Sequence, residues 1–116
     1  MPHCIIEYSQ ELAANVDPGV LVDSVHAGAI NSALFEEHAI KSRAIAYQYF
    51  RSGVQPQSFV HVTLRILSGR TLVQRKALSE SVLSALTGLG LKGVSLTVAV
   101  EDMERESYAK VVVGPE

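Results

Sequence analysis

Apolar and polar residues alternate along two segments in the second half of the chain, residues 58–67 and residues 93–101. Alternation with a period of two is typical of a strand that buries one face. The apolar positions of these segments are Val60, Val62, Leu64 and Ile66, followed by Val94, Leu96, Val98 and Val100. We therefore predict two strands, each with one face in the core.

The segment between these strands has the features of a helix. Thr71-x-x-Gln74 matches a capping box, and it follows a predicted turn at Ser68-Gly69-Arg70. Apolar residues then recur at helical spacing, at Leu78, Val82, Ala85 and Leu89. Gly88 or Gly90 is expected to end this helix, because glycine adopts the backbone conformation that terminates helices without strain.

The first half of the chain predicts the same elements in the same order. Residues 3–8 favour a strand, with Ser9 and Gln10 starting a polar connection, and residues 39–50 form a second extended segment before a Gly- and Pro-containing connection at residues 53–56. Between them, Asp17-Pro18 is a good helix start, because aspartate caps free amides and proline at the first helical position loses no hydrogen bond. Helical spacing predicts that this helix reaches Ser32, with its apolar stripe at Leu21, Val25, Gly28 and Ala29.

The predicted fold class is α+β, in a single domain that spans residues 1–116. Two β-α-β units can form one four-stranded sheet with both helices on the same face. The other face of that sheet would carry Phe59, Thr97 and Ala99, which make it too apolar for full exposure to water. We therefore expect an oligomer, in which the apolar residues 111–113 could pair with the sheet edge of a neighbouring copy.

The composition excludes several classes of protein. Hydrophobic residues make up 47% of the 116 residues and the formal net charge is −2, so neither disorder nor the basic surface of a nucleic-acid-binding protein is expected. Cys4 is the only cysteine and cannot form an internal disulfide, which fits a reducing compartment. The first residues lack the basic and long apolar stretches of a signal peptide, and no segment is apolar enough to cross a bilayer. These features favour a cytoplasmic protein without a membrane partner.

Four segments of the chain resemble one family of enzymes. These are the opening MPHCIIEYS, then Ile40-Lys41-Ser42-Arg43, Phe59-Val60-His61-Val62-Thr63-Leu64 and Ser68-Gly69-Arg70-Thr71. Together, in register with the predicted β-α-β-β-α-β order, they are similar to the 5-carboxymethyl-2-hydroxymuconate Δ-isomerases of the tautomerase superfamily. The similarity weakens after about Glu101.

The resemblance implies an enzyme that moves a proton between carbons of a small dienol bearing two or three carboxylates, from the breakdown of homoprotocatechuate and related aromatics. It implies a homotrimer, no metal and no organic cofactor. It also implies that Pro2 is the general base and Arg70 a catalytic partner, with Lys41 and Arg43 as carboxylate-binding residues. Position 41 often carries arginine in this family, so Lys41 bears on the exact substrate more than on the reaction.

The chemistry of Pro2 is consistent with that role. A free α-amine titrates at about pH 8, already near the working pH that suits a general base. Burial and a nearby cation would lower the pKa further, and the proline ring fixes the direction of the lone pair. Arg70 has the donors that fit a carboxylate or a developing enolate oxygen. This role requires that Met1 be removed, because the Pro2 nitrogen is otherwise an amide.

Simpler interpretations of these residues remain open. Lys41 and Arg43 lie two apart, hence on one face of a strand, and could form a solvated edge. His3 and His61 are expected to be packed or surface histidines, Cys4 a buried small hydrophobe, and residues 101–106 a solvated segment; for Glu7, on the face of His3, a structural ion pair is favoured over a role in the site. The functional alternatives are another tautomerase reaction on the same proline, of 4-oxalocrotonate or phenylpyruvate type, and a non-catalytic oligomeric scaffold or binding protein.

Overall fold

The computed structural model describes residues 2–54 and 57–115. Its main elements are β1 (His3–Ser9), α1 (Pro18–Asn31), β2 (Lys41–Tyr47), β3 (Ser58–Leu67), α2 (Leu72–Thr87) and β4 (Val94–Met103). Short 3-10 helices follow β1 (η1, Gln10–Ala14), precede β2 (η2, Glu37–Ala39) and follow β4 (η3, Arg105–Ser107). The predicted order of two β-α-β units is confirmed; the expectations for Met1 and for part of the 53–56 connection fall outside the described residues.

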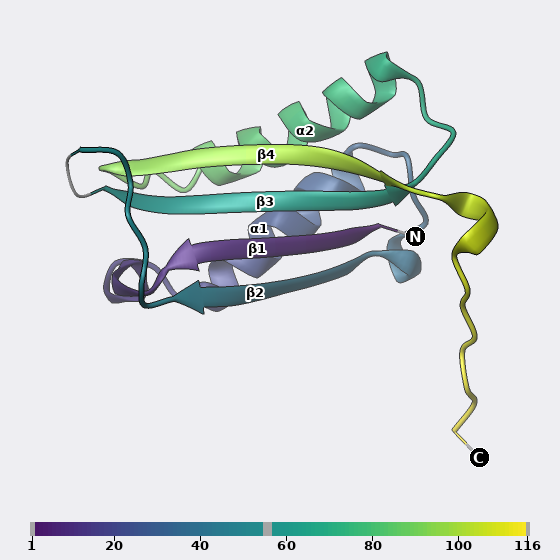
Figure 1. Ribbon diagram of the computed structural model, residues 1–116, viewed down its shortest axis with the longest axis horizontal. Coiled ribbons are helices and arrows are strands. Elements are labelled where there is room, and N and C mark those ends of the chain that lie inside the picture. The colour runs from purple at the N-terminus through teal and green to yellow at the C-terminus, as the bar shows by residue number, and fades with distance from the viewer. Residues whose placement is uncertain (1, 55–56, 116) are drawn as a thin grey trace.

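The strands form one mixed sheet in the order β2-β1-β3-β4. Each β-α-β unit contributes a parallel pair, and the two units meet through the antiparallel pair β1 and β3 at the centre. Both helices cover the same face of the sheet, as Figure 1 shows. The predicted α+β arrangement is therefore confirmed. The other face of the sheet, called the open face below, is not covered by any helix of the described residues.

The core lies between the sheet and the two helices. Leu64 and its alternate neighbours on β3 are completely buried, as the alternation predicts. Other fully buried apolar side chains come from β1, η1, both helices and Pro2 before β1: Pro2, Cys4, Ile6, Leu12, Leu21, Val25, Ala29, Leu78, Val82 and Leu86. The stripe predicted for α2 needs one correction, because Leu86 is buried whereas Ala85 is only half-buried. Ala85 instead lies beside Gly28 of α1, where the two helices meet.

Gly28 allows the two helices to approach closely. A Cβ atom at this position would lie 2.9 Å from the Cα of Val82 and 3.2 Å from the carbonyl oxygen of Ser81. The hydroxyl of Ser81 donates a hydrogen bond of 2.7 Å to the carbonyl oxygen of Gly28. A larger residue at position 28 would push α1 and α2 apart, so this glycine is required by packing.

The predicted helix starts are confirmed. The carboxylate of Asp17 accepts a hydrogen bond of 2.8 Å from the backbone N–H of Gly19. At α2 both bonds of the capping box form, at 2.9 Å to the Gln74 side chain and 3.1 Å to the Thr71 hydroxyl. Helix α2 ends with Gly88 as its cap, in the right-handed helical conformation (φ −63°), and the left-handed conformation typical of helix ends is adopted two residues later by Gly90 (φ 69°).

The second strand is shorter than the predicted segment 39–50. It begins only at Lys41, because η2 occupies the residues before it, and it ends at Tyr47. The physical reason for the end is the length of its partner, since Ser9 is the last residue of β1 and pairs with Tyr47. An extended segment stays a strand only where a neighbouring strand supplies hydrogen bonds.

The C-terminal residues 109–115 are exposed, and the end of the chain extends away from the body of the molecule, as Figure 1 shows. Val111, Val112 and Val113 are about four-fifths exposed, at 81%, 78% and 80%. Their pairing with a neighbouring copy stays a prediction. Among the described residues, no helix has the length and apolar character needed to span a membrane.

Candidate functional site

The predicted site residues gather at one end of the sheet. Strands β1 and β2 begin there, and β3 and β4 end there, because the two parallel pairs run in opposite directions. Pro2 precedes β1, Lys41 is the first residue of β2, and Arg70 follows β3. The N mark in Figure 1 lies at this end. The topology therefore brings residues that are far apart in the sequence to the same end of the sheet.

Pro2 is buried at the start of the central strand β1. Its carbonyl oxygen accepts a hydrogen bond of 3.1 Å from the backbone N–H of Lys41. His3 and Lys41 are the first paired residues of β1 and β2, and this bond adds Pro2, the residue before His3, to the pairing of the two strands. Pro2 and the first residue of β2 are therefore fixed relative to each other by backbone geometry.

Lys41 and Arg43 lie on the open face, as their spacing predicts. Both side chains are exposed, whereas Ser42 between them is half-buried on the helix face. Nη1 of Arg43 lies 3.1 Å from Nδ1 of His3. The interpretation of these two residues as a merely solvated edge is therefore incomplete, because Arg43 has a specific partner next to Pro2.

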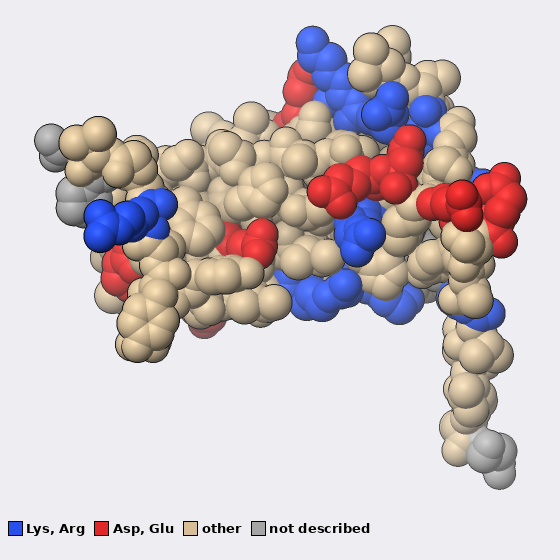
Figure 2. Space-filling view, viewed as in Figure 1, with Lys and Arg blue, Asp and Glu red and all other residues tan. Residues whose placement is uncertain are grey.

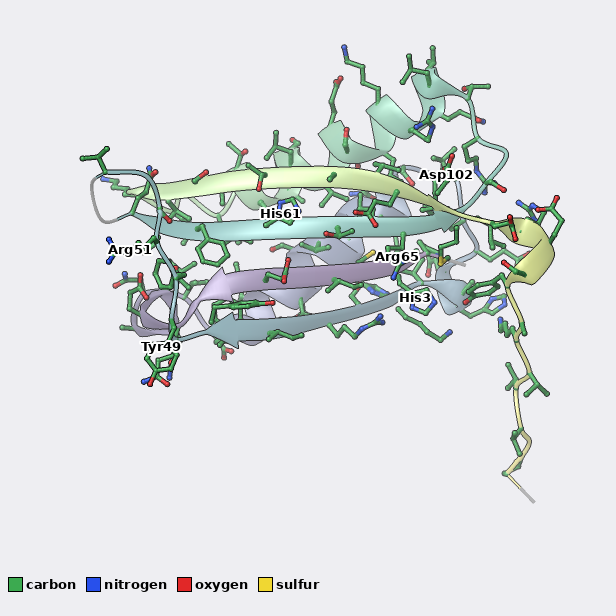
Figure 3. The ribbon with its side chains drawn as sticks, viewed as in Figure 1. His3, Tyr49, Arg51, His61, Arg65 and Asp102 are labelled. Carbon is green, nitrogen blue, oxygen red and sulfur yellow. The ribbon has the colours of Figure 1, made fainter. Side chains whose placement is uncertain are left out.

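His3 and Arg65 join this group although sequence reasoning placed neither in the site. In the register of the sheet, Lys41, His3 and Arg65 are direct neighbours across β2, β1 and β3. Figure 3 shows His3 and Arg65 side by side. Arg65 lies 3.7 Å from the carboxylate of Glu101 on β4, which is the next strand. The only sequence signal was their position on the polar face of each strand, and it does not tell which strands pair.

The electrostatic environment of this group is positive. In Figure 2, which views the open face, Lys and Arg side chains gather toward the end of the sheet where β2 begins, and carboxylates lie nearer β4. Partial burial together with the positive charges of Arg43, Lys41 and Arg65 lowers the pKa of His3. Such a cluster attracts anions, and it disfavours a further positive charge on His3.

Arg70 makes its contacts with the connection that leads into β2. Its Nη2 donates a hydrogen bond of 2.7 Å to the carbonyl oxygen of Leu34, and its guanidinium stacks over the ring of Phe35 at 5.3 Å. In the described part of the chain, these contacts join Arg70 to residues 34–35 rather than to Pro2, Lys41 or Arg43. Arg70 therefore shares the end of the sheet with the other predicted residues and also has a structural partner there.

Other titratable groups have structural partners. Cys4 is fully buried, and burial raises the pKa of its thiol, so the expectation of a buried small hydrophobe is confirmed. Glu7 accepts a hydrogen bond of 2.5 Å from the Tyr47 hydroxyl, which raises the pKa of Tyr47. The ion pair favoured for Glu7 is thus replaced by a hydrogen bond to a phenol. Within the described residues, no three His, Cys, Asp or Glu side chains are grouped as metal ligands would be.

The fold and the cluster at its edge define a class of protein. The mixed sheet of two β-α-β units with both helices on one face is the tautomerase-like fold. The family model of 5-carboxymethyl-2-hydroxymuconate isomerase matches residues 2–108, so the chain belongs to this family of isomerases in the tautomerase superfamily.

Solved structures are similar over almost the whole chain. A 5-carboxymethyl-2-hydroxymuconate delta-isomerase is 18% identical with a TM-score of 0.83, covering 97% of this chain and 89% of that one. The 5-carboxymethyl-2-hydroxymuconate isomerase from Deinococcus radiodurans R1 is 21% identical with a TM-score of 0.79, covering 95% and 88%. A fused 4-OT symmetric trimer is 18% identical with a TM-score of 0.64, covering 93% and 90%. No curated protein sequence matches. At these identities the structural likeness establishes the fold alone.

Proposed function

We propose that this protein is a cofactor-independent isomerase that moves a proton between carbons of a small carboxylate-bearing dienol, similar to 5-carboxymethyl-2-hydroxymuconate. The nitrogen of Pro2 is the general base. The observation that carries the proposal is the position of Pro2 at the start of the central strand, bonded to Lys41 and next to a cluster of cations. Membership of the isomerase family supports the same reaction class.

The reaction needs a base and a stabiliser of negative charge. The Pro2 nitrogen takes a proton from one position of the dienol and returns it to a carbon at the other end of the conjugated system. Negative charge develops on the enol oxygen between these steps, and no atom is gained or lost overall. A free nitrogen is required for this step, so the active form is the chain from which Met1 has been removed.

The cations have distinct proposed roles. Lys41 and Arg43 bind substrate carboxylates from the open face, where both side chains are exposed. Arg70 acts as a catalytic anion clamp through the N–H groups that are not bonded to Leu34. A guanidinium has five N–H donors, so one hydrogen bond to a carbonyl leaves capacity for an anion.

We also propose that the protein is a homotrimer. Its open face exposes apolar side chains such as Ile45, which is 51% exposed in the single chain. A neighbour with the same fold is described as a symmetric trimer, which supports this assembly. Burial of the open face between copies would remove these apolar residues from water.

The decisive experiment replaces the base. Pro2→Ala is expected to lower kcat on 5-carboxymethyl-2-hydroxymuconate by about 10²- to 10⁴-fold, the usual contribution of a general base. Pro18→Ala, a proline at the start of α1, is the matched control and should retain full turnover. Intact-mass analysis of each variant must show the loss of Met1. Full activity of Pro2→Ala would refute the base assignment.

A substrate panel distinguishes the competing functions. Phenylpyruvate carries one carboxylate and a 4-oxalocrotonate-type dienol carries two, so relative kcat/KM values report how many cations the site uses. A scaffold protein would turn over neither of these compounds, nor 5-carboxymethyl-2-hydroxymuconate. An Arg70→Ala variant with unchanged KM and kcat would remove Arg70 from anion binding and leave it as a brace for residues 34–35.

A further inference from the structure

His3 has both of its ring nitrogens engaged. Nδ1 lies 3.1 Å from Nη1 of Arg43 on the neighbouring strand. Nε2 lies 2.9 Å from the hydroxyl oxygen of Tyr108 in the segment after η3. The imidazole therefore bridges a proposed substrate-binding arginine and the C-terminal part of the chain.

The chemistry of the partners decides where the ring proton lies. A guanidinium can only donate hydrogen bonds, so Nδ1 must accept from Arg43 and cannot carry a proton. The proton is then on Nε2, which donates to the oxygen of Tyr108. A doubly protonated ring could not accept from Arg43 at all. The two contacts together require the neutral Nε2–H tautomer.

The surrounding charges favour the same neutral form. Lys41 and Arg43 face His3 from β2, Arg65 faces it from β3, and Tyr108 reaches it from the C-terminal segment. Protonation would place a further positive charge among three cations. The environment that attracts an anionic substrate therefore also keeps His3 able to accept a hydrogen bond.

The C-terminal segment is itself anchored next to this group. Nε and Nη2 of Arg105 donate hydrogen bonds of 3.2 Å and 3.1 Å to the carbonyl oxygen of Ser68, which follows β3. Three residues later, Tyr108 reaches His3 at the start of β1. The chain thus crosses the end of the sheet between two anchoring points. Tyr108 is half-buried, whereas residues 109–115 are exposed.

We propose that His3 is the positioning residue of this site, holding the guanidinium of Arg43 in place for a substrate carboxylate while Tyr108 holds the imidazole. This inference rests on the proposed function, in which Arg43 binds a carboxylate. An arginine on an exposed strand otherwise samples many rotamers. An acceptor at Nδ1 reduces that freedom before substrate arrives, which is preorganisation.

Two conservative variants separate the two nitrogens. The side-chain oxygen of His3→Asn can occupy the place of Nδ1 and accept from Arg43. The side-chain amide nitrogen of His3→Gln can occupy the place of Nε2 and donate to Tyr108. On 5-carboxymethyl-2-hydroxymuconate, we expect His3→Gln to raise KM about tenfold with kcat unchanged, because a hydrogen bond to a charged group is lost. His3→Asn should retain a KM close to that of the original protein. Loss of Met1 is checked by mass in both variants.

A spectroscopic measurement tests the positioning without catalysis. Long-range ¹H–¹⁵N spectra of the full chain should show His3 as the Nε2–H tautomer. Arg43→Ala should raise the pKa of His3 and let the Nδ1–H tautomer appear, because the obligatory donor and a neighbouring positive charge are both removed. If the protein turns over no dienol, the proposed function fails while this measurement still decides the role of His3.

Three results would overturn the inference. The first is an Nδ1–H tautomer in the original protein. The second is a His3 spectrum that does not respond to Arg43→Ala. The third is equal KM values for His3→Asn and His3→Gln, which would show that the acceptor at Nδ1 does not matter.

Discussion

The two faces of strand β3 differ in how complete they are. On the helix face, Val62 and Leu64 are fully buried by residues of the same chain. On the open face, the neighbouring Thr63 is half-buried and Arg65 is exposed. One face of β3 is thus buried by residues of the same chain, whereas the other face is still partly exposed. The helix face accounts for folding, and the open face carries the groups that can bind a substrate or another copy.

The polar groups of the open face are largely paired with one another. Tyr47 donates to Glu7, and Nδ1 of His61 lies 2.7 Å from the hydroxyl of Thr97. Paired groups of this kind can be covered without leaving unsatisfied donors. Within residues 2–54 and 57–115, the ion pairs of the cations near Pro2 are limited to the contact of Arg65 with Glu101. This difference along the open face separates a surface suited to assembly from a site suited to an anion.

The largest effect is expected on the free energy of unfolding, when leucine is replaced by alanine on each of the two faces. Leu64→Ala on the helix face should lower the free energy of unfolding by about 2–5 kcal/mol, because it leaves a cavity in the core. Leu67→Ala, at the end of the same strand on the half-buried open side, should cost clearly less. Denaturant unfolding of both variants measures the two values. Equal losses would show that the open face stabilises the fold as much as the core does.

A smaller effect is expected from a charge on the open face. Ala99→Glu should raise the dissociation constant of the proposed trimer about a hundredfold, because the charge would be buried between copies without a partner. Ala77→Glu adds the same charge at an exposed position of α2 and should leave the assembly unchanged. Analytical ultracentrifugation at several concentrations makes the measurement. Identical masses for both variants would mean that the open face is not the interface.

The smallest effect concerns pH and follows from His3. Its pKa is lowered in the folded state, so the unfolded chain binds more protons in the window below the ordinary histidine pKa. His3 therefore contributes stability that is present above that pKa and is lost as the pH falls through the lower folded value. Urea unfolding between about pH 5 and pH 8 should show a steeper acid loss for the original protein than for His3→Asn. His38→Asn, at an exposed histidine, is the control; the same slope in all three proteins would contradict the expectation.

Most of the fold could be predicted because its signals are local. Alternation along β3, the Asp17 cap and the capping box at Thr71 each depend on residues close in sequence, and all are confirmed. The alternation in the last strand correctly predicts β4, but its apolar side chains Val94, Leu96, Val98 and Val100 are half-buried and pack against the core instead of lying inside it. The order of strands depends on pairing between distant segments, so no local pattern contains it. The face of α2 that points into the core is predicted only approximately, because Ala85 packs against Gly28 and Leu86 is the residue buried in the core.

The candidate site was predicted only in part, for a similar reason. The resemblance supplied Pro2, Lys41, Arg43 and Arg70, whose roles stay proposals. His3 was expected to be an ordinary packed or surface histidine, because a single histidine in a strand carries no sign of its neighbours. Its contacts with Arg43 and Tyr108 join residues 40 and 105 positions apart, and only the folded chain brings them together.

The central position of β1 also determines when during synthesis this strand can be fully paired in the sheet. Of the four strands, β1 is synthesised first and lies between β2 and β3, so it cannot complete its hydrogen bonds on both sides until β3 exists. Translation proceeds at about 5–20 residues per second, which leaves the start of the chain open for some seconds. Enzymes that trim a nascent chain can therefore reach the residues ahead of β1 during synthesis, before Pro2 becomes buried in the finished sheet.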